Sequence, residues 1–117
     1  MQYMCLVHVD GEMMGKLTPK EDKDLTRRSI AYDEALKESG HYVVSNALKG
    51  PESATVVRVR DGKVSMHDGP YVETKEHLGG FILFEARDLN EAVAIAEKIP
   101  MAGFGSIEIR PEYTLEK

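Results

Sequence analysis

Runs of apolar residues predict strands near both ends and in the second half of the chain. Residues 2–9 are apolar at nearly every position except His8, which is typical of a central strand covered on both faces. Residues 80–86 repeat this pattern, and residues 106–110 alternate like an edge strand. A short extended piece is expected over residues 41–47.

A first helix is expected over residues 18–39. Thr18 and Glu21 have the spacing of a capping box, and Gly40 supplies a left-handed stop. Residues at helical spacing form one stripe, which consists of Leu25, Ser29, Tyr32 and Leu36. Because such a stripe faces the core, Tyr32 is expected to point at the sheet, with its hydroxyl tethered.

A second helix is expected after Asp88, which has the spacing of a helix cap with Glu91. Its apolar residues Ala92, Ile95 and Ile99 would then face inward. Pro100 would end it, because proline cannot continue a helix.

The segment TVVRVR-DG-KVSM, residues 55–66, predicts a β-hairpin with Asp61-Gly62 in a type I′ turn. Pairing across a two-residue turn places four apolar side chains on one face: Val57, Val59, Val64 and Met66. We expect this face to join the core. The opposite face, which carries Arg58 and Ser65, is expected to meet water.

The order of these elements predicts one α+β domain over residues 1–117. It is close to a ferredoxin-like split β-α-β unit, an antiparallel sheet with both helices on one face. Residues 2–9 and 80–86 are apolar on both sides, so the second face of the sheet also needs cover. A copy of the chain would supply this cover, which predicts a homodimer.

Charge and composition exclude several classes of partner. The chain has 20 acidic and 15 basic residues and a net charge of −5, which argues against general affinity for nucleic acid or anionic membranes. No apolar run approaches the roughly 18 residues that cross a bilayer, and a signal-peptide pattern is missing, so a cytoplasmic protein is expected. The single Cys5 excludes an internal disulfide and is expected in the core.

The segment MHDGPYVETKEHLGGF, residues 66–81, is far longer than a hairpin needs. Asp68 has two interpretations: it closes a turn onto backbone N–H groups, with Gly69 held extended by Pro70, or its carboxylate faces a pocket as a base or ligand anchor. Both can hold together. Gly79-Gly80 indicates close backbone approach rather than a phosphate site, since no phosphate-loop motif surrounds it.

The candidate acid and base residues are His8 and Asp68. His8 interrupts an apolar strand and forms H-x-D with Asp10 at the strand end, where pockets open in barrels; a partly buried, hydrogen-bonded histidine is the alternative. The candidate ligand contacts are Tyr32, Asp10, Tyr71 and Glu73. Histidine and cysteine spacings predict no metal site, and we expect no cofactor.

Residues 68–81, followed by residues 85–89 and 105–111, resemble the DGPF domain of the YCII-related proteins. The resemblance extends over nearly the whole chain, with Tyr71 in place of the phenylalanine of the family name. It implies a ferredoxin-like protomer that pairs into a dimeric α/β barrel. For shorter members a His–Asp pair with the histidine on the first helix has been proposed, but residues 18–39 contain no histidine.

Two functions are consistent with these residues. The first is a dimeric protein with a small polar cleft, lined by His8, Asp68, Glu73 and Tyr32, that binds a small molecule and catalyses isomerase- or lyase-like proton transfer. The second is a non-catalytic regulatory or scaffold protein. It would act with a protein partner such as a sigma factor, because some family members are encoded beside or fused to one. Convergent polar residues would favour an enzyme, and an exposed apolar patch would favour a scaffold.

Overall fold

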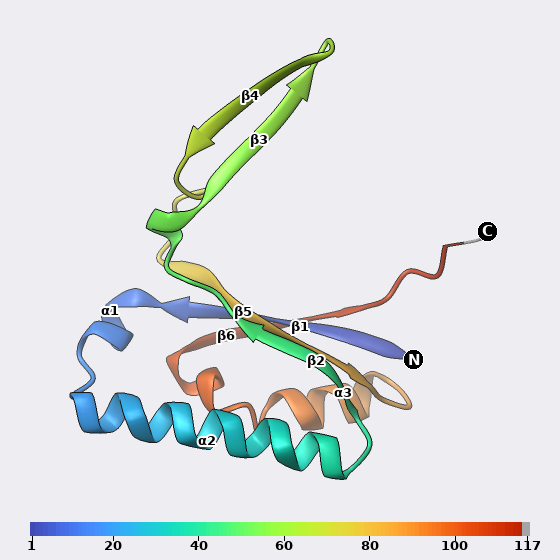
Figure 1. The fold of residues 1–117 in the computed structure, drawn as a ribbon. Coiled ribbons are helices and arrows are strands. Elements are labelled where there is room, and N and C mark those ends of the chain that lie inside the picture. Colours follow the sequence, from blue (N-terminus) through green and yellow to red (C-terminus); the bar gives the residue numbers. More distant parts are fainter. Residues whose placement is uncertain (116–117) are drawn as a thin grey trace.

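A computed structural model describes residues 1–115 (Figure 1). The strands are β1 (Gln2–Asp10), β2 (Tyr42–Ala47), β3 (Thr55–Arg60), β4 (Lys63–Asp68), β5 (Glu76–Glu85) and β6 (Gly105–Pro111). The α-helices are α1 (Gly11–Gly15), α2 (Pro19–Glu38) and α3 (Leu89–Ala96), and two short 3-10 turns are η1 (Pro51–Ser53) and η2 (Pro100–Phe104). None of the described helices is both long and apolar enough to span a membrane.

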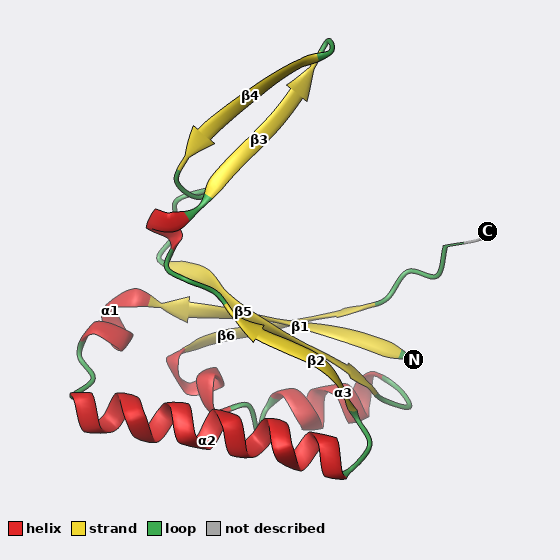
Figure 2. Ribbon diagram, viewed as in Figure 1, coloured by secondary structure: helices red, strands yellow, loops and turns green. Residues whose placement is uncertain are grey.

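The body of the molecule is a four-stranded sheet in the order β2-β5-β1-β6, in which all neighbours are antiparallel. Helices α2 and α3 cover one face of this sheet (Figure 2). The sequence-based prediction of an α+β chain with an antiparallel sheet and helices on one face is confirmed, and this arrangement is consistent with a ferredoxin-like fold.

The core lies between the sheet and the two helices. Alternate residues of β1 face this core, and Cys5 and Phe84 are completely buried in it. Burial raises the pKa of the Cys5 thiol to about 11, so the thiol is neutral near pH 7. Cys5 is therefore the core residue that its apolar surroundings predicted.

Three local helix signals are confirmed, whereas α3 ends at Ala96, before the stop expected at Pro100. Thr18 Oγ1 accepts a hydrogen bond from the Glu21 backbone N–H, and the Glu21 carboxylate accepts one from Thr18 N. Gly40 follows the helix with a φ of 82°, a left-handed conformation that glycine adopts without steric cost. Asp88 caps α3, as its spacing from Glu91 predicted.

The face of the sheet opposite the helices, which we call the open face, is apolar at its centre. Cross-strand partners such as Met4 and Leu83, and Leu6 and Phe81, lie on it side by side. Val44 of β2 and Leu78 of β5 extend this apolar surface, and both are exposed.

Strands β3 and β4 form a separate two-stranded sheet, residues 55–68, which we call the arm. It projects from the body on the side away from the helices (Figures 1 and 2). Val59 pairs with Val64 and Val57 with Met66, as predicted. Asp61 and Gly62 have φ angles of 51° and 75°, which are the left-handed values of a type I′ turn.

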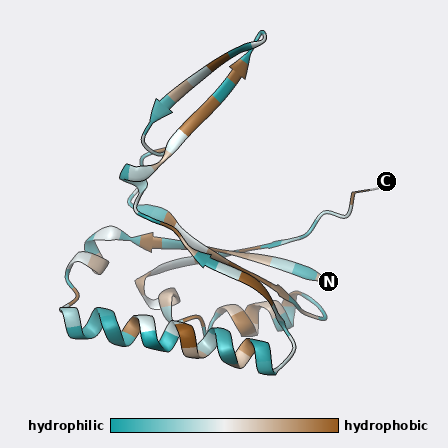
Figure 3. Ribbon diagram, viewed as in Figure 1, coloured by the Kyte–Doolittle hydropathy of each residue, from teal (hydrophilic) through white to brown (hydrophobic). Residues whose placement is uncertain are grey.

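The expected burial of the arm was wrong for the single chain. The four apolar side chains on one of its faces are 56–70% exposed: Val57, Val59, Val64 and Met66. Figure 3 shows the hydrophobic segments along the projecting strands. The Cα radius of gyration is 16.3 Å, against about 13 Å for a compact domain of this length, because the arm stands clear of the core.

The segment after the arm is shorter than the sequence indicated. Strand β4 continues to Asp68 and β5 begins at Glu76, so the connection spans residues 69–75. Gly69 has a φ of 96° and is not held extended by Pro70 as predicted. Its N–H instead donates to Ala54 O at 2.8 Å, which closes the base of the arm, and the chain leaves this closure in a conformation that favours glycine.

Candidate functional site

A cavity of about 310 Å³ lies between α2 and the helix-covered face of the sheet. It exists because small residues from three elements meet there: Ser29, Ala47 and Gly80. A Cβ atom on Gly80 would lie 2.8 Å from Asn46 O, so β2 and β5 approach closely only because this residue is glycine. The close approach that Gly79-Gly80 indicated is therefore confirmed.

Most of the cavity wall is apolar. The lining includes Val7, Val9, Leu25, Ile82, Ile99 and Met101. Ile30, which is 59% exposed, also lines the cavity and places it in contact with solvent. An apolar cavity of this size has room for one ring-sized molecule, since small-molecule sites range from about 300 to 1,000 Å³.

The polar residues that line the cavity include a hydrogen-bonded chain at Asp33 and Ser45; the others are Asp22, Thr26, Ser29 and Asn46. Ser45 Oγ donates to Asp33 Oδ2 at 2.9 Å, and the hydroxyls of Tyr42 and Ser45 are 2.8 Å apart. Because the one hydroxyl proton of Ser45 goes to Asp33, Tyr42 is the donor to Ser45. Asp33 Oδ1 accepts no hydrogen bond from any group within residues 1–115.

Asp33 thus lines the cavity with one carboxylate oxygen that has no hydrogen-bond partner within residues 1–115. Asp33 follows Ser29 by one helical turn, so both side chains lie on the same face of α2. The Asp33 carboxylate is able to accept a hydrogen bond from a ligand hydroxyl or amine, or to take up a proton as a base.

Tyr32 also lines the cavity, so its position agrees with its expected inward direction. Its hydroxyl donates to the backbone carbonyl of Ile95 at 2.6 Å, which confirms the predicted tether. Burial, with smaller contributions from Cys5 and Glu97, raises the pKa of the Tyr32 hydroxyl. Tyr32 therefore offers an apolar ring surface to the cavity while its hydroxyl is engaged elsewhere.

His8 lies on the open face, on the opposite side of the sheet from Tyr32. His8 Nε2 is 2.9 Å from Glu108 Oε1, and these side chains are 30% and 48% exposed. A histidine and a carboxylate in such contact can donate and accept protons as an acid–base pair. Within one chain it does not share a cleft with Tyr32.

The two aspartates singled out in the sequence have different environments. Asp10 is 7% exposed, and its Oδ1 accepts hydrogen bonds from the N–H groups of Glu12 and Met13, which caps α1. Lys75 Nζ is 3.8 Å from Asp10 Oδ2. Asp68 is exposed at the base of the arm, and its side-chain carboxylate accepts no hydrogen bond from residues 1–115. The turn closure expected of Asp68 is therefore wrong, because Ala54 O takes the Gly69 N–H.

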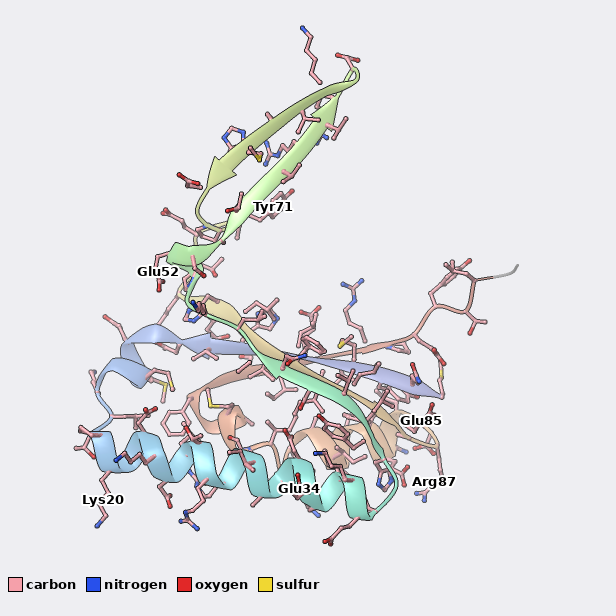
Figure 4. The ribbon with its side chains drawn as sticks, viewed as in Figure 1. Lys20, Glu34, Glu52, Tyr71, Glu85 and Arg87 are labelled. Atoms are coloured by element: carbon pink, nitrogen blue, oxygen red, sulfur yellow. The ribbon has the colours of Figure 1, made fainter. Side chains whose placement is uncertain are left out.

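Tyr71 and Glu73 lie in the connection between the arm and β5. Tyr71 is 78% exposed, and the Arg58 guanidinium lies 5.7 Å from its ring centroid (Figure 4). Glu73 and His77 line a second pocket, of about 390 Å³, at the base of the arm. The sequence-predicted site residues thus occupy four places in one chain: the cavity, the open face, the start of α1 and the base of the arm.

Sequence reasoning missed Asp33 and Ser45. A signal for Asp33 was present, because the small Ser29 interrupts the apolar stripe of α2 and Asp33 follows it by four residues. Nothing in the sequence placed Ser45 against it, since that contact depends on how β2 packs on the helix. Within residues 1–115 no group of three or more His, Cys, Asp or Glu side chains is arranged to hold a metal ion.

Comparisons with known proteins relate the whole chain to one family. The model of the YCII-related domain matches residues 1–114. The uncharacterized protein R00369 of Rhizobium meliloti (strain 1021) is 31% identical over 113 residues, which cover 95% of this chain and 91% of that protein. Among solved structures, the chain is similar to 5-chloro-2-hydroxyhydroquinone dehydrochlorinase (TftG) from Burkholderia phenoliruptrix AC1100, in complex with 2,5-dihydroxybenzoquinone. The TM-score is 0.57 with 18% identity, over 97% of this chain and 94% of that one.

Proposed function

We propose that this chain, which belongs to the family of YCII-related domains, binds a small ring-sized molecule with hydroxyl groups. The binding site would be the cavity beneath α2. The observation that carries this proposal is the pairing of a largely apolar wall with the Asp33 carboxylate, which Ser45 holds in place. The wall would cover the faces of a ring, and Asp33 Oδ1 would accept a hydrogen bond from a hydroxyl group.

The chemical class of this ligand also has support from a similar fold. The dehydrochlorinase named above acts on a hydroxylated ring, and its complex contains 2,5-dihydroxybenzoquinone. At 18% identity this likeness concerns the fold, so the ligand class is our proposal for this chain. It agrees with the size of the cavity and with the Asp33 carboxylate in its lining.

The reaction that we propose is proton transfer of the isomerase or lyase type. In the isomerase case, Asp33 would remove a proton from one atom of the ligand and return it to another. The hydrogen bond from Ser45 stabilises the ionised carboxylate, which is the form present before the first transfer and after the second. His8 and Asp68 are the second acid–base candidate. Within one chain His8 contacts Glu108 on the open face while Asp68 lies at the base of the arm, so these residues would share one site only if a second copy supplied one of them.

We further propose that the protein is a cytoplasmic homodimer of the DGPF type in which two open faces pack together as a dimeric barrel. The apolar centre of the open face supports the dimer, because a contiguous apolar sheet surface seldom stays in contact with water. The one cysteine, Cys5, is free and buried, which agrees with a reducing compartment.

The cavity is tested by the shift in melting temperature that hydroquinone produces under anaerobic conditions. Ser29→Phe should fill the cavity and abolish the shift, while Ala31→Phe, on the exposed side of α2, should preserve it. Asp33→Asn should reduce the affinity at least tenfold, because the charge strengthens the hydrogen bond to the ligand. Glu34→Gln is the matched control, since Glu34 is 62% exposed and contacts Lys37 (Figure 4).

The ring alone provides the second control. p-Xylene has a similar shape but no hydroxyl group, so it should bind more weakly and should be insensitive to Asp33→Asn. If hydroquinone stabilises the Ser29→Phe and Ala31→Phe variants equally, ligand binding beneath α2 is contradicted.

A non-catalytic protein that acts with a protein partner such as a sigma factor is the alternative function. The exposed apolar side of the arm favours it, because such patches mark protein interaction sites. A chain that binds no ring compound in the cavity and co-purifies in a defined ratio with another protein would favour this alternative.

A further inference from the structure

We propose that the arm is a clasp that each copy of the chain lays against the second copy of the homodimer, with the face of Val57, Val59, Val64 and Met66 buried there. This inference rests on the proposed dimer and extends it. The contact between open faces and the contact of the arm are separate surfaces, and each is tested on its own.

The arm cannot be stable in isolation as a bare hairpin. Two-stranded hairpins are marginally stable in water, and β3 pairs with β4 alone. The hydrogen bond from Gly69 N–H to Ala54 O closes the base of the arm. Beyond this bond the apolar side chains of the arm are exposed, because no other segment of residues 1–115 covers them. A hairpin with one apolar side and this register therefore needs a surface that the single chain does not provide.

The position of the arm selects a second copy as that surface. The arm rises on the same side of the sheet as the open face (Figure 1). A molecule that covers the open face consequently lies beside the arm. The same copy is then able to cover both surfaces, and in a two-fold symmetric pair each arm would make the same contact.

The size of the open face points the same way. A four-stranded face with strands of about seven residues covers about 400 Å² in projection, from a strand spacing of about 4.8 Å and a rise of about 3.3 Å per residue. Stable interfaces bury about 800 Å² on each partner. One side of the arm adds about 200 Å² per copy by the same spacing, and each copy gains a second such contact from its partner's arm.

The test compares two lysine substitutions at neighbouring positions of β4 by sedimentation equilibrium. Val64→Lys places a charge on the apolar side of the arm, and Ser65→Lys places the same charge on its polar side; both positions are exposed in the single chain. Val64→Lys should raise the dimer dissociation constant at least tenfold, and Ser65→Lys should change it less than twofold. Thermal melts of the two variants under monomeric conditions should agree.

Hydrogen exchange of the unmodified protein provides the second measurement. The amides of β3 and β4 should exchange at least tenfold more slowly well above the dissociation constant than well below it. The clasp is overturned if both variants form dimers equally well and the hydrogen exchange of the arm does not depend on protein concentration. The proposed contact between the open faces would be unaffected by this result. A chain that stays monomeric at millimolar concentration would overturn the dimer and the clasp together, while ligand binding beneath α2 would still be decided by its own variants.

Discussion

Burial and hydrogen bonding decide the role of each of three aspartates in this chain, and their place in a motif does not. Asp10 was of interest beside His8, and it is a buried cap for α1. Asp68 opens the DGPF-like segment, yet its side chain is exposed and accepts no hydrogen bond within the described residues. Asp33, which no motif marked, lines the cavity and accepts a hydrogen bond from Ser45 there.

This contrast gives a stability prediction. Asp10→Ala should lower the free energy of unfolding by about 1–2 kcal/mol, because two helix N–H groups lose their acceptor. Asp68→Ala should change it by less than about 0.5 kcal/mol, as exposed substitutions do. Urea denaturation of both variants measures this difference. Equal losses would show that Asp68 has a structural partner that the single chain lacks.

Among the elements, α2 carries both the core stripe and the cavity, so its start matters for the site. Thr18→Ala should cost about 1 kcal/mol of unfolding free energy, because the N3 N–H of the capping box loses its acceptor. Thr26→Ala makes the same chemical change within the helix, where alanine is favoured, and should be neutral or slightly stabilising. A Thr18→Ala variant as stable as Thr26→Ala would contradict the role of the cap.

Local signals predicted the elements well because each depends on a few neighbouring residues. The capping box at Thr18, the stop at Gly40 and the turn at Asp61-Gly62 are of this kind, and all are present in the structure. The pattern of the arm correctly predicted its register. It did not predict that the apolar side of the arm is exposed in the single chain. Alternation identifies an apolar face that favours burial, but it does not show which surface covers that face.

The site was harder to predict because it depends on packing between distant segments. Ser29, Ala47 and Gly80 come from three elements and make the cavity only after α2 lies on the sheet. The same holds for the contact of Ser45 with Asp33. His8 and Tyr32 were expected in one cleft. Successive residues of β1 alternate between the two faces of the sheet, which puts His8 on the open face, whereas Tyr32 belongs to α2 and lies on the helix side.

At the scale of the whole molecule, the chain combines a cavity on one side of its sheet with two apolar surfaces on the other that the single chain leaves exposed. The cavity lies beneath α2, and the open face and the arm lie opposite. We therefore expect ligand binding and association to be separate: a variant of the arm should leave the cavity intact, and a filled cavity should leave the arm unchanged.

The methionine methyl groups test the central claim, ligand binding beneath α2, in one NMR titration. Met14 and Met101 line the cavity, whereas Met4 lies on the open face and Met66 on the arm. With methyl-labelled methionine, hydroquinone should shift the Met14 and Met101 signals saturably and leave Met4 and Met66 in place, and Asp33→Asn should weaken this response at least tenfold. A titration that leaves Met14 and Met101 unmoved, or that shifts only Met4 and Met66, would contradict the account.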